Sequence, residues 1–309
     1  MSSIIQNGLS VSIPPWKRIG YYLLLAPLLI SSCIRDDYQP CPPLQVQLTV
    51  TDKNYFNVNS APQESPKSET LAFSAYIPTL YYALRDATTG NIIEEQGVFN
   101  VTGSEQTLPL TFCECLPFGK YVLTVWGGLP DNTSLTDNSL TSILHKNALE
   151  GNDTYLVHDT LVYDAQHYTY KLGMQRATGK LIIDVTNLPA SVRYDNKNIS
   201  NIFERVNYQF GYQSPITVNK PDTWASTEEV VLRTILAPST GNLSSLLHID
   251  FYDNPSLANP TLTPQDVYIT MKRNELTILK YVYDEEAQDF NIYLWLNDSW
   301  DVIYNLDIN

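Results

Sequence analysis

The sequence is poor in the residues and motifs on which most catalytic and metal sites depend. Its 309 residues include four histidines without metal-ligand spacing, and it contains no Gly-x-Ser-x-Gly, phosphate-binding loop, Gly-x-Gly-x-x-Gly or His-Glu-x-x-His. Acidic pairs such as Glu285 and Glu286 lie beside expected turns, and adjacent carboxylates of a strand point to opposite faces. We therefore expect no enzymatic activity, no cofactor and no metal.

Basic residues are also scarce. Lysine and arginine total 19 against 33 acidic residues, which gives a net charge of −14. This balance argues against nucleic acid or anionic lipid as a partner through plain electrostatics. With 21 tyrosines, 19 prolines, 13 glycines and only three methionines, the composition is typical of strands and turns rather than helix bundles.

The sequence lacks a hydrophobic run long enough to cross a bilayer as a helix. The apolar block from Ile19 to Ile30 follows Lys17 and Arg18, and it is shorter than the ~20 residues that a transmembrane helix needs. Ile30, Ser31, Ser32 and Cys33 then follow, and this stretch resembles a bacterial lipobox. We expect residues 1–32 to be a lipoprotein signal peptide; an uncleaved anchor or a secretory signal with a chance cysteine is the alternative.

In this interpretation Cys33 is the first residue of the mature chain and carries the lipid. Several acyl chains hold a protein on a membrane far more firmly than one chain, which binds only marginally. The stretch 34–37, Ile-Arg-Asp-Asp, resembles the acidic signal that directs lipoproteins of Bacteroidetes to the outer face of the outer membrane. Residues 33–43 are then a lipidated tether on the cell surface.

Three cysteines follow the lipidation site, an odd number for an exported chain. Cys113 and Cys115 flank one residue, so in a strand both would point to the same face and pair poorly with each other. Either one bridge forms, from Cys41 to Cys113 or Cys115, or none does.

Alternating patterns predict strands along most of the chain. In the first half they cover 44–50, two strands within 80–97, 121–126 and 161–172, and the stretch 138–150 is the best short helix. In the second half they cover 180–189, 204–212, 228–238, 245–253 and a hairpin of 275–284 with 290–298. We predict an all-β protein with two antiparallel β-sandwich domains in series, at 44–172 and 173–309.

Two further features bear on function. Trp126, Trp224, Trp295 and Trp300 would suit stacking on sugars if they shared an exposed face, but tryptophans in strands more often pack in cores. The stretch 159–161, Asp-Thr-Leu, resembles a short acceptor motif for O-glycosylation in exported Bacteroidetes proteins, which would place a glycan on Thr160.

The lipidated cysteine, the Cys-Pro at 41–42 and the strand stretches behind them resemble the FimB-type family of fimbrial anchor subunits from Bacteroidetes. The stretches that carry the resemblance are "LYYALRDATTGNI" (80–92), "GKYVLTVWGGLPDN" (119–132) and "LGMQRATGKLIIDVTNLP" (172–189). It covers most of 33–190, and beyond that only the strand pattern agrees. The Gly-Gly at 127–128 and the Cys-x-Cys at 113–115 depart from the family pattern.

The resemblance implies a structural role. Family members have two transthyretin-like, Greek-key β-sandwich domains, and they anchor a fimbrium to the outer membrane or limit its length. Expected partners are the fimbrial stalk or other minor subunits, joined when a strand of one protein completes a sheet of the next. The C-terminal stretch 301–309 is a candidate donor strand through Val302, Tyr304, Leu306 and Ile308, or else an ordinary last strand.

A second hypothesis is a surface glycan-binding lipoprotein of a polysaccharide-uptake system. It would share the lipid anchor and the sandwich domains, and two or more coplanar, exposed tryptophans would favour it. A third hypothesis is a hydrolase, which would require a cleft in which carboxylates from different parts of the chain converge.

Overall fold

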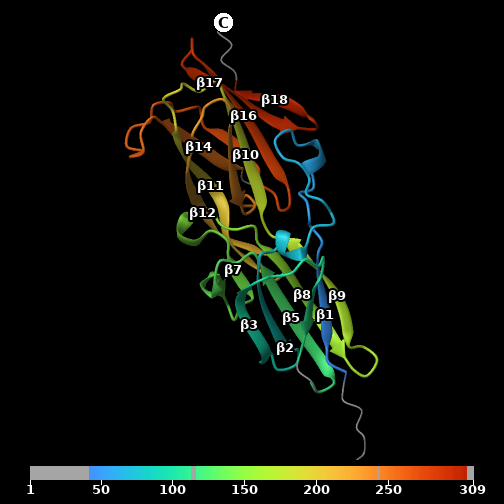
Figure 1. Cartoon of the computed structure of the whole chain (residues 1–309). Helices are drawn as coiled ribbons and strands as arrows, with labels where there is room; N and C mark the ends of the chain where they lie inside the picture. Colours follow the sequence, from blue (N-terminus) through green and yellow to red (C-terminus); the bar gives the residue numbers. More distant parts are fainter. Residues whose placement is uncertain (1–41, 113–115, 242–243, 305–309) are drawn as a thin grey trace, which may run out of the picture. The chain divides into compact units, whose positions relative to one another are not determined.

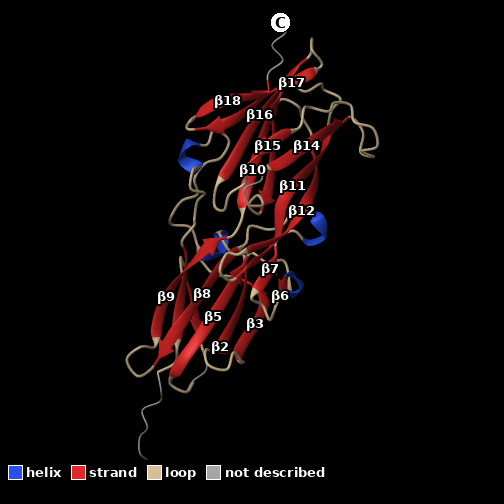
Figure 2. Ribbon diagram, turned by 180° about the vertical axis from the view of Figure 1, so that it is seen from behind, coloured by secondary structure: helices blue, strands red, loops and turns tan. Residues whose placement is uncertain are grey.

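The computed structural model describes residues 42–112, 116–241 and 244–304, and strands account for most of the ordered backbone (Figure 1). Within these residues, helical structure is limited to four 3-10 turns of three residues each (Figure 2). The eighteen strands lie in curled sheets. The all-β fold class predicted from the sequence is confirmed.

In chain order the strands are β1 (Gln45–Val50), β2 (Thr79–Asp86), β3 (Ile92–Asn100), β4 (Leu108–Thr111), β5 (Gly119–Gly127), β6 (Leu135–Thr136), β7 (Thr141–Ile143), β8 (Tyr155–Tyr163), β9 (Thr169–Arg176), β10 (Gly179–Thr186), β11 (Tyr194–Asn207), β12 (Tyr212–Thr223), β13 (Val230–Leu236), β14 (Ser245–Tyr252), β15 (Val267–Ile269), β16 (Leu276–Asp284), β17 (Asp289–Leu296) and β18 (Ser299–Tyr304).

Seven strands of the first half form one sheet in the order β3-β2-β5-β8-β9-β1-β4. The first strand shows why the sequence folds this way, since Leu44, Val46 and Leu48 are buried while Gln45 and Gln47 between them are exposed. The apolar side chains enter a cluster that we call the N-terminal core, with members from Leu44 to Met174. β1 pairs in parallel with β9 and antiparallel with β4.

The second half contains a five-stranded sheet, β13-β10-β16-β17-β18, and a six-stranded sheet, β15-β14-β11-β7-β6, with β12 paired to β11. Apolar side chains of these sheets, together with some from the first half such as Tyr81, Trp126 and Leu156, form a second cluster that we call the C-terminal core. Within it Phe251 of β14 stacks on Phe290 of β17 with ring centroids 5.4 Å apart. β10 pairs in parallel with β16 and antiparallel with β13.

A segment of the first half joins the sheet of the second half. The short strands β6 and β7 pair with each other, and β7 pairs with β11 through Ile143 opposite Arg205. The helix expected at 138–150 is therefore wrong: this stretch holds β7 and one 3-10 turn. Its apolar spacing suggested a helix, but the backbone of β7 bonds to β11, and Asn147 and Ala148 have positive φ values that end a helix.

Two expected strands prove to be strand pairs interrupted by a turn. Between β8 and β9, the Asp164 carboxylate accepts hydrogen bonds from the backbone N–H groups of Gln166 and His167. Between β11 and β12, the Asn207 side chain accepts from Gln209 and Gly211 in the same way. The turn at 164–167 contains neither glycine nor proline, and the other contains the single Gly211, so the sequence pattern does not divide either stretch.

The C-terminal hairpin agrees with its sequence pattern. β16 and β17 pair from Leu279–Leu294 to Asp284–Asp289, and the Asp284 carboxylate closes the turn by accepting from Glu286 and Ala287. The second strand ends earlier than expected, at Leu296, because Asn297 and Asp298 both have positive φ and form a two-residue turn into β18.

A buried arginine joins segments that are far apart in the sequence. The Arg176 side chain is 2% exposed, and its Nε donates to both carboxylate oxygens of Asp153 at 2.9 and 3.0 Å. The same guanidinium donates to the Asn274 side chain and to the Tyr155 hydroxyl. The division of the chain into domains at 173 stays a prediction, and Arg176 lies beside that position.

Candidate functional site: the sheet edge at β18

Most residues expected to carry the membrane attachment lie outside the described residues. This applies to the lipobox residues Ile30, Ser31 and Ser32, to the lipidation site Cys33, and to the three other cysteines, Cys41, Cys113 and Cys115. Their roles stay predictions. In the part of the chain that the structure describes, no helix is long and apolar enough to span a bilayer.

The candidate donor stretch is partly described, and its first residues form an edge strand. β18 pairs antiparallel with β17, with Val302 opposite Tyr293 and the backbone of Tyr304 opposite Ile292. Among the described residues no strand pairs with the other side of β18. Leu306 and Ile308 lie outside the described residues, so the assignment of 301–309 as a donor strand stays a prediction.

The β18 edge is apolar and open to solvent. Val302 is 54% exposed and Ile303 is 39% exposed, and Leu296 just before the turn is 43% exposed. An edge strand presents backbone N–H and C=O groups that a further strand can pair with, unless charge, proline or a covering segment prevents it. Asp301 is the single charged side chain of β18. This edge can therefore accept a strand.

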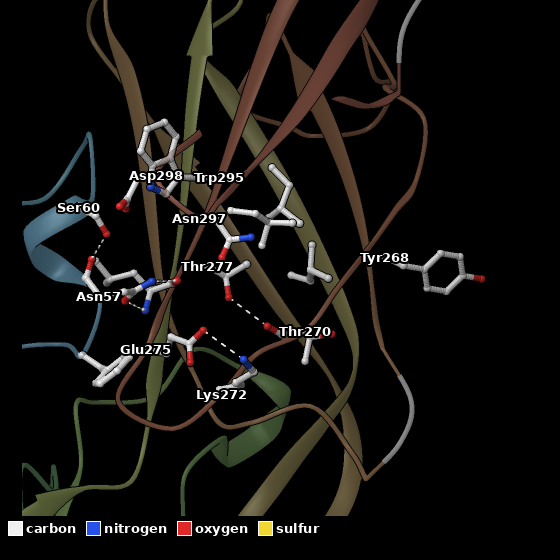
Figure 3. Close-up of a pocket in the computed structure, with 15 residues that line it drawn as sticks. Asn57, Ser60, Tyr268, Thr270, Lys272, Glu275, Thr277, Trp295, Asn297 and Asp298 are labelled. Carbon is white, nitrogen blue, oxygen red and sulfur yellow. Dashed lines mark hydrogen bonds and ion pairs between the residues drawn. The ribbon is translucent and has the colours of Figure 1, made fainter. Parts of the chain in front are cut away.

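A pocket of about 620 Å³ lies beside the same hairpin (Figure 3). Its walls come from the end of β17 and its turn, the start of β16, β15, and the loop that contains Asn57 and Ser60. Lys272 and Glu275 form an ion pair of 3.3 Å at one side, whereas Tyr268 points away from the pocket in Figure 3. The wall is thus a mixture of polar and apolar groups.

The pocket exists because β17 separates from β16. Pairing between the two strands ends at Leu279–Leu294, although β17 continues to Leu296. At Leu276 the Asn57 side chain occupies the place of the missing strand: its amide nitrogen donates to the Leu276 carbonyl and its amide oxygen accepts from the Leu276 N–H, both at 2.8 Å (Figure 3). A side-chain amide here imitates the hydrogen bonds of a neighbouring strand.

The tryptophans do not form the flat exposed surface that would favour stacking on sugars. Trp126 is buried, with its Nε1 donating to the Ser139 carbonyl at 2.8 Å, and Trp224 is partly buried, with its Nε1 donating to Val192 at 3.1 Å. Trp295 and Trp300 contact each other edge to face, with centroids 5.0 Å apart and an interplanar angle of 70°. The structure brings only these two together, and they are not coplanar.

Thr160 is exposed on β8, opposite Val122 of β5. Its backbone N–H donates to the Asp159 carboxylate at 2.7 Å. O-glycosylation at Thr160 stays a prediction, and its accessibility is compatible with it. Among the described residues, no group of three histidine, cysteine, aspartate or glutamate side chains is placed to hold a metal ion.

The sequence pattern did not reveal the pocket or the role of Asn57. Asn57 lies in the stretch 51–70, which the sequence shows as a polar loop. Its partner Leu276 is far away in the chain, so only the folded structure places them together.

No family model matches the sequence, and no curated protein matches it. Solved structures that share the fold include candidate adhesins and a fimbrial anchor protein from Bacteroidetes.

One such neighbour is a candidate adhesin from Bacteroides thetaiotaomicron, with a TM-score of 0.54 and 15% identity over 87% of this chain and 100% of that one. A second is the fimbrial anchor protein Mfa2 from Porphyromonas gingivalis, with a TM-score of 0.50 and 12% identity over 85% of this chain and 100% of that one. A third is a candidate polysaccharide-binding protein from B. thetaiotaomicron, with a TM-score of 0.54 and 12% identity over 85% and 98% of the two chains. At these identities the likeness establishes the fold.

Proposed function

We propose that this protein is a non-enzymatic lipoprotein of the outer membrane that anchors or caps a fimbrium on the cell surface. It is held by lipid on Cys33, and it joins other fimbrial subunits by strand addition. The fold supports this proposal, because structures that share it include a fimbrial anchor protein and candidate adhesins.

The single observation that carries the strand-addition step is the open edge at β18. This strand is the last one described, it has a free side among the described residues, and Val302 and Ile303 are both exposed. A strand added to β18, or the exchange of β18 for a partner's strand, would satisfy backbone groups and cover these apolar side chains. β18 is held on one side only, as is β13 at the other edge of the sheet, and it is joined to its one partner, β17, by a two-residue turn.

The test is co-purification from solubilised outer membranes of the native host. We expect a fimbrial stalk protein to co-purify with the wild-type protein, and deletion of 301–309 to leave the protein folded and exported but to abolish co-purification. Loss of folding on deletion would contradict the proposal, because the segment would then be an ordinary structural strand.

A point variant separates recognition from folding. Val302→Lys places a charge on the edge, which discourages strand addition, and we expect at least about a tenfold loss of recovered stalk with little change in stability. The matched control is Val162→Lys. Val162 is similarly exposed, at 44%, but its backbone pairs with Lys120 of β5 on one side and bonds to the Tyr170 hydroxyl on the other. Equal recovery with both variants would contradict strand addition at β18.

A further inference from the structure

Strand β11 places two charged side chains where its pattern should place apolar ones. Asp195, Lys197 and Ile199 alternate on the face that enters the C-terminal core, and Asp195 and Lys197 are both 0% exposed. Charged residues are almost never fully buried unless they are paired, because removal of an ion from water costs several kcal/mol. These two positions therefore need a specific explanation.

The lysine lies between two different carboxyl groups. Its Nζ is 2.6 Å from Oδ1 of Asp195 and 2.7 Å from Oδ2 of Asp222 on β12. The other oxygen of Asp195 is buried and has no hydrogen-bond partner among the described residues. The other oxygen of Asp222 lies 3.5 Å from Nζ of Lys220, and the Asp222 side chain is 26% exposed.

The two carboxyl groups consequently differ in chemistry. Burial raises the pKa of Asp195 to about 6, against the opposing attraction of Lys197, so its neutral acid form is accessible in the core. Asp222 has a second cation, Lys220, and contact with solvent. A neutral carboxylic acid is a far better acceptor for an amine than a carboxylate, whereas a carboxylate can take up a proton.

We propose that Lys197 and Asp195 condense into an intramolecular isopeptide bond. The Asp222 carboxylate takes a proton from the Lys197 ammonium, and the freed amine attacks Cγ of the neutral Asp195. A bond forms between Nζ and Cγ, the bond from Cγ to one carboxyl oxygen breaks, and that oxygen leaves as water with its own proton and one from the amine. Asp222 ends with the proton that it took, so atoms and charges balance without an added reactant.

The surroundings favour this product over the ion pair. Condensation replaces a buried ammonium and a buried acid with a neutral amide, which removes the charge from the core. The unpartnered oxygen of Asp195 is the atom that departs, and the N–H of the new amide stays in place to donate to Oδ2 of Asp222. Asp222 still keeps Lys220 beside it. The reacting groups are already in contact, which removes most of the entropic barrier to bond formation.

Peptide mapping of the purified full-length protein tests the bond. Trypsin cuts after arginine and after unmodified lysine, so an unlinked chain gives the peptides 194–197 and 198–205. The isopeptide blocks the cut after Lys197, and we expect one peptide, 194–205, that is lighter than its sequence by one water. Fragmentation of this peptide should give no break between residues 195 and 197.

Variants assign the roles of the groups. Lys197→Arg keeps the positive charge but lacks a nucleophilic amine, and we expect its peptides to show full mass. Asp222→Asn removes the base, and we expect the linked fraction to fall by about tenfold or more at equal incubation time. The matched control is Lys220→Arg. Lys220 contacts the carboxylates of Asp222 and Glu150 but not Asp195, so this variant should leave the link intact.

Three results would overturn the proposal. One is wild-type protein that gives 194–197 and 198–205 at full mass. Another is loss of water with normal cleavage after Lys197, which would indicate a cyclic imide at Asp195. The third is a branched peptide that joins Lys197 to Asp222, which would exclude Asp195 as the acceptor.

Discussion

Strands β1 and β11 both supply one face of a core, but they do it with different residues. In β1 the core-facing positions hold leucine and valine, and in β11 they hold Asp195 and Lys197 before the first isoleucine. β1 is placed by its own alternation. Both strands have a neighbour on each side, β4 and β9 for β1 and β12 and β14 for β11, but only in β11 does this pairing hold charged residues at buried positions. Burial in a sheet therefore follows from pairing as well as from hydrophobicity.

The largest expected effect comes from moving a lysine into the other core. Leu48 of β1 is 0% exposed and packs among aliphatic and aromatic side chains. Leu48→Lys buries a cation without the carboxyl groups that surround Lys197, and we expect the free energy of unfolding to fall by about 4 kcal/mol or more. Urea unfolding measures this.

The control for that variant is Gln47→Lys, on the exposed face of the same strand, with little expected change. If Leu48→Lys were as stable as the wild type, the N-terminal core would tolerate charge as well as the C-terminal core does. The contrast between β1 and β11 would then fail.

A second buried polar group gives the C-terminal core a pH dependence. His145 is 0% exposed; the Ala237 N–H donates to its Nε2 at 2.9 Å, so its Nδ1–H donates to the Leu149 carbonyl at 3.0 Å. Burial lowers the pKa of His145 from 6.5 to about 4. The folded state thus favours the neutral ring, and its contribution is present above pH 6.5 and is lost as the pH falls towards 4.

We expect this loss to reach up to about 3 kcal/mol, because each unit of pKa difference corresponds to about 1.4 kcal/mol. The free energy of unfolding can be measured from pH 7 to pH 4 for the wild type and for His145→Gln. We expect it to depend less on pH in the variant. His167→Gln is the control, since His167 is exposed on a turn. Identical slopes for all three proteins would contradict the assignment.

The smallest effects are expected from variants that change only an apolar side chain of either core. Ile77 in the N-terminal core and Ile199 in the C-terminal core are both 0% exposed. Ile→Val at either position removes one buried methylene, and we expect each variant to lose about 1 kcal/mol in urea unfolding. A much larger loss at Ile199 would show that the apolar packing beside Lys197 collapses less readily around a cavity than the other core does.

The sequence pattern predicts the fold where one face of a strand is apolar. The strand at 44–50 and the hairpin of β16 and β17 are confirmed, because buried residues recur at about every second position along most of their length. The pattern misses most of β11 and all of β12, whose residues include Asp195, Asn196, Lys197 and Pro215. The strands that pair with β11 and β12 come from distant parts of the chain, so a short stretch of sequence does not show which strands these are.

For the candidate site, the sequence points to the right region but not to its geometry. Alternation alone predicts a strand through Val302 and Tyr304, and the structure places both in an edge strand. The pocket beside them depends on Asn57, whose side chain bonds to Leu276 at the start of β16. Such a contact depends on the complete chain path, so no spacing rule could have found it.

The parallel pairing of β1 with β9 has a consequence for how the protein is made. β1 is the first described strand to leave the ribosome, but its parallel neighbour begins at Thr169, and β10 likewise waits for β16. Neither sheet can close until a much later stretch of the chain has been synthesised. Non-local pairings of this kind slow folding, so the nascent polypeptide stays unfolded for longer, and an extended chain is the form in which an exported protein can be threaded across a membrane.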